Sequence, residues 1–305
     1  MKMSNSEHKL KKWLNIQFDR LDRRNLLNWL SDSSYLKIRF WMKMGKKLEL
    51  NNPKTFNEKL QFLKLHDRNP KYTEMVDKYE VREYIKNELG EEYLIPILGV
   101  YDKFEDINFE ELPEQFVLKC THDSGGLVVC TDKSKLDIEA ARNKINKCLE
   151  QNYYYRGREY PYKNVIPRII CEKYMVEDDL GTGLKDYKFM CFSGEVKCSF
   201  VCLNRNSVEG LNIDFYDMDW KKMPFERYYP NSDILLPKPK NYNQMINFAE
   251  KLAKDIPFIR VDFYEINGRL YFGELTLYPG SGFEGFTPES YDNVLGDWIK
   301  LPAKQ

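Results

Sequence analysis

The stretch IRVDFYEINGRLYFGELTLYPGSGFE, residues 259 to 284, contains two runs of β-forming residues separated by Asn267-Gly268. Runs rich in Ile, Val, Phe, Tyr and Leu are typical of strands, and Asn-Gly is the strongest short signal for a β-hairpin. Asp262 lies five residues before Asn267, and Glu274 lies six residues after Gly268. The pattern therefore predicts a hairpin that brings these two carboxylates close together across the ladder.

The two acids allow two interpretations. Like charges opposite each other destabilise a hairpin, and a cation between them would remove the conflict. Two carboxylates suit Mg²⁺, which proteins usually hold with one or two carboxylates plus substrate phosphates. Thr276 lies on the same strand face as Glu274 and would add an oxygen. The alternative is that both acids lie on a solvated face and have no chemical role.

The composition limits the class of protein. A chain of 305 residues can form two or three lobes, and its formal net charge of zero gives no overall attraction for nucleic acid. No run approaches the length of a membrane span and no signal peptide is visible, so we expect a cytoplasmic protein. Seven cysteines without a CxxC pair indicate reduced, buried thiols. Nothing near the three histidines supports a histidine-based mechanism.

The N-terminal part is predicted to be helical. Apolar spacing indicates helices over residues 7 to 30 and 33 to 45, the second closed by Gly45, and a further helix that begins at Thr55 or Asn57. Three basic runs, KLKKW, RLDRR and KMGKK, lie in this part. They predict a solvated helix face or, alternatively, peripheral contact with a membrane surface or another anionic partner.

From residue 94 onward the pattern changes to short strands. Strands are predicted at 94 to 102, 116 to 120, 127 to 130 and 166 to 175, with a hairpin over 184 to 203 and helices over 138 to 151 and 242 to 256. The fold class is therefore α+β with mainly antiparallel strands. We predict an N-terminal helical extension over 1–50, followed by units at 51–115, 116–180 and 181–305.

The segment FVLKCTHDSGGLVVC, residues 116 to 130, is a candidate phosphate site. Gly125 and Gly126 would let backbone N–H groups approach a phosphate, with Ser124 beside them, and Lys119 would reach the same phosphates as a point charge. The alternative is a plain hairpin with a Gly-Gly turn. No Walker A or GxGxxG motif is present, so neither a P-loop nor a dinucleotide-binding site is predicted.

Three further groups fit a nucleotide site only weakly by themselves. Lys78 lies at a predicted helix start, where a cation opposes the helix dipole. The segment IICEKYMVEDD runs from a strand into an acidic loop, which would suit an adenine edge and a ribose. Arg260 shares a strand face with Asp262 and would either stabilise a transferring phosphoryl group or form a salt bridge.

The order of these motifs resembles the ATP-grasp superfamily. NPKTFNEKLQFLKLHDR and FGELTLYPGSGFE are similar to the TupA-like branch associated with bacterial cell-surface polysaccharides. The resemblance covers roughly residues 35 to 300. It implies an ATP-grasp fold with two α+β lobes that clasp ATP. It also implies ATP- and Mg²⁺-dependent attack of a substrate carboxylate on the γ-phosphate, followed by displacement of phosphate from the acyl phosphate by an amine.

The resemblance also implies roles for individual residues. Nucleotide binding would involve Lys78, Lys119, Ser124, Gly125, Gly126, Glu172, Lys173, the backbone of Met175, and Asp186 as the ribose acid, with Asp178 or Asp179 as alternatives for that acid. Asp262, Glu274 and Thr276 would hold magnesium. Arg260, Lys119 and Ser281 would act in catalysis. Many members have Asn where this chain has Thr276, which leaves open how many magnesium ions are held.

The leading hypothesis is a carboxylate–amine ligase that joins an amino acid or amine to a uronic-acid-type precursor of a surface or capsular polysaccharide. Such an enzyme would work beside other polysaccharide-synthesis proteins. One alternative is a nucleotide-sugar glycosyltransferase, for which Asp217-Met218-Asp219 supplies a DxD motif. A second is a non-catalytic protein on an ATP-grasp frame. Tyr153 to Tyr155 and Trp220 would stack on sugars or simply pack, and Arg156, Arg158 and Arg205 are candidate clamps for a carboxylate.

Overall fold

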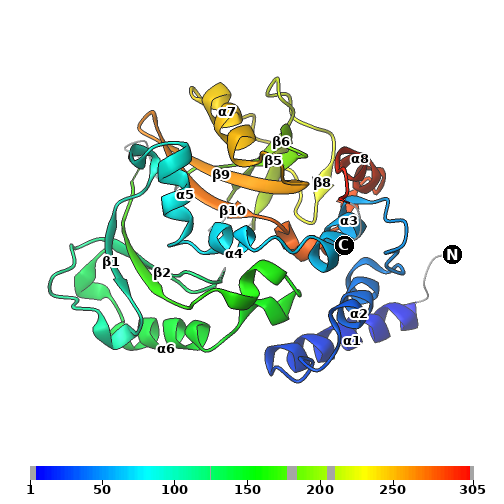
Figure 1. Cartoon of the computed structure of the whole chain (residues 1–305), viewed down its shortest axis with the longest axis horizontal. Coiled ribbons are helices and arrows are strands. Elements are labelled where there is room, and N and C mark those ends of the chain that lie inside the picture. The colour runs from blue at the N-terminus through cyan, green and yellow to red at the C-terminus, as the bar shows by residue number, and fades with distance from the viewer. Residues whose placement is uncertain (1–4, 124, 177–183, 205–209, 303–305) are drawn as a thin grey trace.

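The protein has an α+β fold built on two antiparallel sheets (Figure 1). The computed structural model describes residues 5–123, 125–176, 184–204 and 210–302, with side chains from residue 13. The strands predicted from the sequence are confirmed, and FVLKC and LVVC form strands at the expected residues. The domain limits proposed from composition stay a prediction.

The first sheet has the order β1-β4-β2-β3, with β1 at Ile97–Tyr101, β2 at Phe116–Cys120, β3 at Leu127–Cys130 and β4 at Ile169–Lys173. Helix α6 (Ile138–Leu149) covers one face, where Leu118, Ile145 and Cys171 share a core cluster. Because side chains alternate along a strand, Lys119 and Glu172 lie on the other face. This alternation directs the charged groups of β2 and β4 away from α6.

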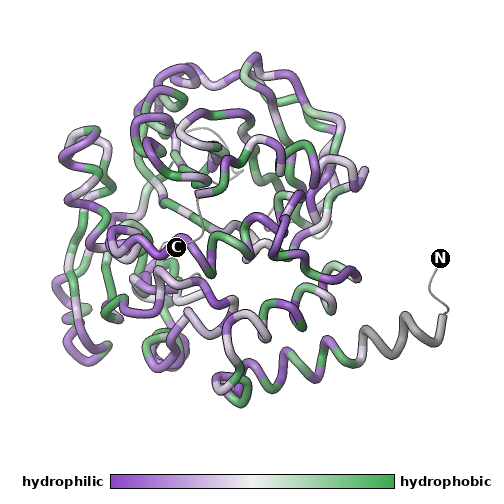
Figure 2. The backbone as a smooth tube through the Cα atoms, turned by 45° about the vertical axis from the view of Figure 1, so that its right-hand side comes forward, coloured by the Kyte–Doolittle hydropathy of each residue, from purple (hydrophilic) through white to green (hydrophobic). Residues whose placement is uncertain are grey.

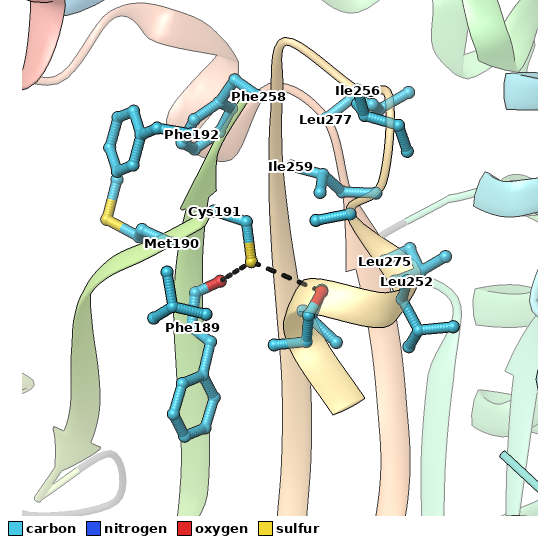
Figure 3. Close-up of a cluster of buried hydrophobic side chains, with 14 of the residues drawn as sticks. Phe189, Met190, Cys191, Phe192, Leu252, Ile256, Phe258, Ile259, Leu275 and Leu277 are labelled. Atoms are coloured by element: carbon cyan, nitrogen blue, oxygen red, sulfur yellow. Dashed lines mark hydrogen bonds between the residues drawn. The ribbon is translucent and has the colours of Figure 1, made fainter. Parts of the chain in front are cut away.

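The second sheet has the order β10-β9-β5-β6-β7, with β5 at Asp186–Phe192, β6 at Glu195–Leu203, β7 at Asn212–Tyr216, β9 at Phe258–Ile266 and β10 at Arg269–Thr276. Helix α7 (Tyr242–Leu252) packs on it, and Figure 3 shows the apolar side chains beneath this helix. The Cys191 thiol contacts the carbonyls of Phe189 and Ala249 there, which ties β5 to α7. Asp186 and Lys188, which come earlier on β5, alternate with Phe189 and Cys191 and so lie on the other face of the sheet.

The remaining elements join the two sheets. Helices α4 (Lys71–Val76) and α5 (Val81–Glu88) lie between them (Figure 1). Helix α3 (Phe56–His66) packs on α8 (Ser290–Trp298), beside the two-stranded pair β8 (Glu226–Arg227) and β11 (Phe286–Thr287). Short 3₁₀ helices occur at Glu91–Tyr93 (η1), Phe104–Asp106 (η2), Lys133–Lys135 (η3), Tyr153–Arg156 (η4) and Tyr160–Asn164 (η5). The tight turn Pro279–Gly282 (η6) differs from them, because Gly280, Ser281 and Gly282 have left-handed φ values.

The start of α3 follows its sequence signals. Thr55 is the N-cap: its side chain accepts from the Glu58 N–H, and Glu58 accepts from the Thr55 N–H in return. Asn57, the alternative cap, instead donates its backbone N–H and its side-chain amide to Asp292 of α8, each at 3.0 Å. The N-terminal end of α3 is thereby bonded to a helix more than 200 residues away in the chain.

The helix predicted over residues 7 to 30 is confirmed as far as Arg23 and is wrong beyond that residue. Helix α1 spans Asn5–Arg23 and ends where Asn25 adopts a left-handed φ of 60°, a conformation that asparagine tolerates. The chain then turns into α2 (Asp32–Met44), which Gly45 closes as predicted, with a φ of 77°. Both views place α1 at the edge of the molecule (Figures 1 and 2). Among the described residues, no helix has the length and apolarity to cross a membrane.

The contact between α3 and α8 predicts a sensitive glycine. A Cβ on Gly296 would lie 2.2 Å from the Lys54 carbonyl oxygen and 2.8 Å from the Phe56 nitrogen. Alanine favours helix by about 1 kcal/mol, but a backbone clash cannot be relieved by a rotamer change. We expect Gly296→Ala to destabilise the fold by about 1–3 kcal/mol and to lower Tm by roughly 3–10 °C.

Differential scanning calorimetry would measure this change. Gly285→Ala is the matched control, because a Cβ on Gly285 meets no atom within 4 Å. Equal Tm values for the two variants would show that α8 does not pack on the residues around Thr55 as described.

Candidate active site

The two carboxylates of the hairpin stand directly opposite each other, as predicted. Glu274 pairs with Asp262 in the register of β9 and β10, and the turn residues Asn267 and Gly268 have left-handed φ values of 50° and 75°. A bulge at Gly273 takes up the one extra residue on the second strand. Without this bulge, Glu274 would fall on the opposite face of the sheet, because strand side chains alternate.

The cation between the two acids in this structure is the guanidinium of Arg260. Its Nε donates to Asp262 Oδ1 at 2.6 Å, and its Nη2 donates to Asp262 Oδ2 at 2.7 Å and also to Glu274. Thr276 completes the group by donating to Glu274 Oε1 at 3.1 Å. Of the two interpretations of Arg260, a salt bridge or stabilisation of a transferring phosphoryl group, the structure shows the salt bridge. The phosphoryl role stays a prediction.

A second cation, Lys188 on β5, also lies at this group and was missed by sequence reasoning. Its ammonium contacts Asp262 and lies 2.7 Å from Asp186 Oδ2. Lys188 pairs with Asp262 in the β5–β9 register, which explains the contact. A signal was present in LKDYKFM, because a lysine two residues after Asp186 in an otherwise apolar strand shares its face.

The charges in this cluster set the protonation of the acids. Burial favours the neutral form of Glu274, but Arg260, Lys188 and Lys78 outweigh it and lower its pKa to about 2. Burial raises the pKa of Asp262 to about 6, against the attraction of Arg260 and Lys188. Both groups are therefore carboxylates at neutral pH, the form that binds a metal ion.

The glycine-containing turn after β2 adjoins this cluster. The Gly126 N–H donates to both carboxylate oxygens of Asp123, at 3.0 and 2.9 Å, and its carbonyl accepts from the Cys120 N–H. The Lys78 ammonium contacts the Asp123 carbonyl, and burial lowers the pKa of Lys78 against the attraction of Glu274 and Asp123. Lys78 and Gly126 thus come together as predicted; Ser124 lies outside the described residues.

The residues predicted for the adenine side do not all lie on the same face of β4. Glu172 is 7% exposed and accepts from Lys119 at 2.6 Å, while Arg82 contacts its other oxygen at 3.5 Å. Lys173 is exposed and, by strand alternation, lies on the opposite face of β4 from Glu172. Met175 follows the end of β4. The alternative ribose acids Asp178 and Asp179 lie outside the described residues.

Two cavities meet over the hairpin. One, of about 250 Å³, is lined by three residues predicted to bind the nucleotide, Lys119, Gly126 and Asp186, and also by Lys188 and Asp262. The other, of about 280 Å³, is lined by a different set of residues, among them Glu159, Tyr162, Arg260, Thr276 and Ser281. Both are lined by Lys78, Asp123, Gly273 and Glu274. A ligand in one cavity would therefore touch the same lysine and carboxylate as a ligand in the other.

The predicted Ser281 is held tightly in the second cavity. Its N–H donates to the Tyr278 carbonyl at 2.8 Å, and its hydroxyl accepts from the buried Lys64 ammonium at 2.9 Å. Ser281 has a left-handed φ of 53°, between glycines of similar φ. Lys64 was missed by sequence reasoning; its signal is a lysine four residues after Leu60 on the buried stripe of α3.

The other sequence candidates have structural roles. Asp217 accepts from the N–H groups of Asp219 and Lys221 at 2.9 and 2.8 Å, which makes the DxD motif a local turn. Neither aspartate lines the two cavities just described. Trp220 stacks on Tyr216 at 4.1 Å, and Arg158 donates to the Leu27 carbonyl. Arg205 lies outside the described residues.

The sequence of this chain matches the family model for TupA-like ATP-grasp proteins over residues 58 to 300. The chain belongs to the TupA-like ATP-grasp family. The resemblance inferred from the motifs is confirmed, and with it the α+β ATP-grasp fold. The match begins after α1 and α2, within α3. No match was found among curated protein sequences.

Several solved structures resemble this family member over part of their length. The D-alanine–D-alanine ligase from Bacillus anthracis complexed with ATP has a TM-score of 0.40 and 15% identity, covering 67% of this chain and 53% of its own. The ligase from Helicobacter pylori has a TM-score of 0.38 and 14% identity, covering 79% and 62%. The biotin carboxylase domain of 2-oxoglutarate carboxylase from Hydrogenobacter thermophilus, with MgADP and bicarbonate, has a TM-score of 0.40 and 16% identity, covering 76% and 47%. The chain thus spans about half to three fifths of these proteins.

The donor set of the TupA-like chain fits a magnesium ion that is shared with phosphates. Within the described residues, no group of three or more His, Cys, Asp or Glu side chains forms a metal cage. Magnesium is instead typically held by one or two carboxylates together with substrate phosphates. The opposed carboxylates Asp262 and Glu274, beside Lys78 and Lys188, provide that arrangement.

The Arg260 ion pairs predict a measurable link to magnesium. Replacing Arg260 by Met leaves the buried Asp262 and the partly exposed Glu274 without the cation that bridges them, so we expect a loss of about 3 kcal/mol of stability and a Tm lower by roughly 6–12 °C. Adding Mg²⁺ should raise the Tm of Arg260→Met more than that of the unmodified protein. Arg269→Met, an exposed arginine of the same hairpin, is the control. An unchanged Tm would contradict the bridging role.

Proposed function

We propose that this protein is an ATP- and Mg²⁺-dependent carboxylate–amine ligase. The observation that carries the proposal is the pair of adjoining cavities over the opposed carboxylates Asp262 and Glu274, in a member of the TupA-like ATP-grasp family. A ligase of this type needs a site for triphosphate beside a site for two further reactants. The shared lining by Lys78 and Glu274 gives both cavities access to the same phosphoryl group.

The phosphate side of the reaction is assigned to the cavity of about 250 Å³. Lys78, Lys119 and Lys188 supply positive charge there, and the Gly126 turn allows close backbone approach. Asp262 and Glu274 would hold magnesium, which when bound would neutralise charge on the phosphates and orient them. Arg260, bound to both acids, is placed to stabilise negative charge that develops on the transferred group.

The chemistry then follows from position and charge. A substrate carboxylate oxygen attacks the γ-phosphate, the bond between that phosphorus and the ADP oxygen breaks, and an acyl phosphate forms. An amine attacks the acyl carbon, phosphate leaves, and an amide remains. Lys78 lines both cavities and Arg260 lines the second, so both would lie beside the transferred phosphate when the amine attacks.

The substrate class is part of the proposal. We assign the carboxylate to a uronic-acid-type precursor of a surface or capsular polysaccharide and the nucleophile to an amino acid or amine, supported by the TupA-like family membership. The cytoplasm as the place of action and other polysaccharide-synthesis proteins as partners are proposed on the same ground. The DxD alternative lacks support, because Asp217 closes a local turn.

A thermal-shift titration tests the nucleotide assignment. We expect Mg-ATP to raise Tm, because a ligand that binds the native state adds about 2.7 kcal/mol of stability at 100 times its Kd. Mg-GTP and Mg-UDP-glucose should leave Tm unchanged. In Glu274→Gln the Mg-ATP shift should fall sharply, whereas Glu265→Gln, on the same hairpin and bonded to Asn241, should keep it. A rise in Tm with Mg-UDP-glucose alone would contradict the ligase proposal.

A turnover assay tests the reaction class. Purified protein with Mg-ATP, glucuronate and a panel of amino acids should release ADP only when both acid and amine are present. Glu274→Gln should reduce this rate by at least about 100-fold, because its carboxylate is the one whose charge is fixed at all working pH values. ADP release that persists in this variant would contradict the assigned metal ligand.

A further inference from the structure

The second cavity contains a buried polar chain that the phosphate chemistry does not use. Lys64 is fully buried, and its ammonium donates to Ser281 O at 2.7 Å, to Gly157 O at 2.8 Å and to Ser281 Oγ at 2.9 Å. The Ser281 hydroxyl lies beside the Glu159 carboxylate, because Ser281 Oγ and Glu159 Oε1 both lie within 3.0 Å of the position that a Cβ on Gly157 would take, and its hydrogen bond lowers the pKa of Glu159 against the effect of burial. Glu159 is 5% exposed and lines the cavity of about 280 Å³. Lys64, Ser281 and Glu159 thus form one chain that ends on a carboxylate facing the cavity.

This chain is costly to build, which indicates a function. A non-glycine residue with φ of 53°, such as Ser281, typically costs about 1–3 kcal/mol. Gly157 has no room for a side chain, because its Cβ would lie 2.2 Å from Ser281 Oγ. Burying Lys64 and Glu159 adds desolvation, which lowers the pKa of Lys64 to about 7 and raises the pKa of Glu159. Such groups in a cleft are candidates for a functional site.

The lining of the cavity favours a cationic ligand at Glu159. Of the basic residues of this cavity, Lys78 donates to the backbone carbonyl of Asp123, and Arg260 is ion-paired with the two opposed acids. Tyr153 and Tyr162, which pack at 4.9 Å, present aromatic rings in the same cavity as the Glu159 carboxylate. A carboxylate beside aromatic rings is a typical environment for an ammonium group.

We infer that Glu159 binds the ammonium group of the amine substrate and accepts its proton, with Ser281 and Lys64 as the positioning residues that hold Glu159 in place. This inference deepens the proposed ligase function and rests on it for the chemical step. Glu159 takes one proton from the ammonium, which frees the nitrogen lone pair. The nitrogen then bonds to the acyl carbon, the bond from that carbon to the phosphate oxygen breaks with its electrons on phosphate, and the second N–H proton leaves with phosphate.

The raised pKa of Glu159 suits this task. A carboxyl group whose pKa lies above the usual value is a stronger base than an exposed glutamate, and general bases work best when their pKa approaches the working pH. The shared lining residues Lys78 and Glu274 place the ammonium site next to the transferred phosphate. The amine would therefore be held on the side of the acyl phosphate opposite the nucleotide.

A binding experiment tests the site without knowledge of the natural amine. The full chain, saturated with Mg-ATP, is titrated at matched ionic strength with ethylammonium, with ethanol as the uncharged probe and with acetate as the anionic probe. We expect ethylammonium alone to raise Tm, by roughly 3 °C at ten times its Kd. Glu159→Gln should abolish this shift, while Glu289→Gln, an exposed glutamate outside both cavities, should retain it.

Several outcomes would overturn the inference: no ethylammonium shift in the unmodified protein, an equal shift in Glu159→Gln, or a larger shift with acetate. If Glu159→Gln does not fold, Glu159→Asp replaces it and should bind ethylammonium at least about threefold more weakly, because the shorter acid cannot span from Ser281 to the ligand. An ethylammonium shift that depends on Glu159, together with no Mg-ATP shift, would uphold the ammonium site and reject the nucleotide assignment.

Discussion

The pairing of Asp262 with Glu274 across the β9–β10 hairpin is the constraint on which the rest of the site depends. Two carboxylates at this spacing repel each other, so the protein must supply positive charge on the same face of the sheet. Arg260 and Lys188 do so from neighbouring positions in the β9 and β5 registers, and Lys78 adds charge from the segment between α4 and α5. The negative charges of the acids are thus compensated by cations of the protein itself, and the same groups fit a phosphate and a metal ion.

Balanced clusters of this kind bind ligands by exchange. A phosphate that approaches Lys188 and Arg260 competes with the carboxylates, and a metal ion that approaches the carboxylates competes with the cations. Bringing both ligands together replaces each broken ion pair with a new one, so the exchange costs little electrostatic energy compared with either ligand alone. This symmetry is the physical reason to expect nucleotide and magnesium to bind as one unit.

The sequence predicted much of this hairpin and much less of its surroundings. Asn267-Gly268 set the turn, and the spacing of five and six residues placed the acids close together, with the odd residue absorbed by the bulge at Gly273. Contacts within a hairpin are short-range, so local pattern determines them. Lys64, Glu159 and Lys188 come from other elements, and only the three-dimensional fold brings them to the site. Likewise, apolar spacing could not show that Asn25 would end α1 early.

The packing of α3 against α8 affects how the chain folds during its synthesis. Asn57 donates to Asp292, a partner 235 residues further along, and Lys59 donates to the carbonyls of Gly296 and Ile299. Contacts of such long sequence separation slow folding, because a large loop must close before they form. On the ribosome, α3 leaves the exit tunnel well before α8 has been translated. The face of α3 that packs on α8 therefore stays exposed until α8 is made. Early segments of this nascent polypeptide are therefore expected to be the ones that chaperones protect.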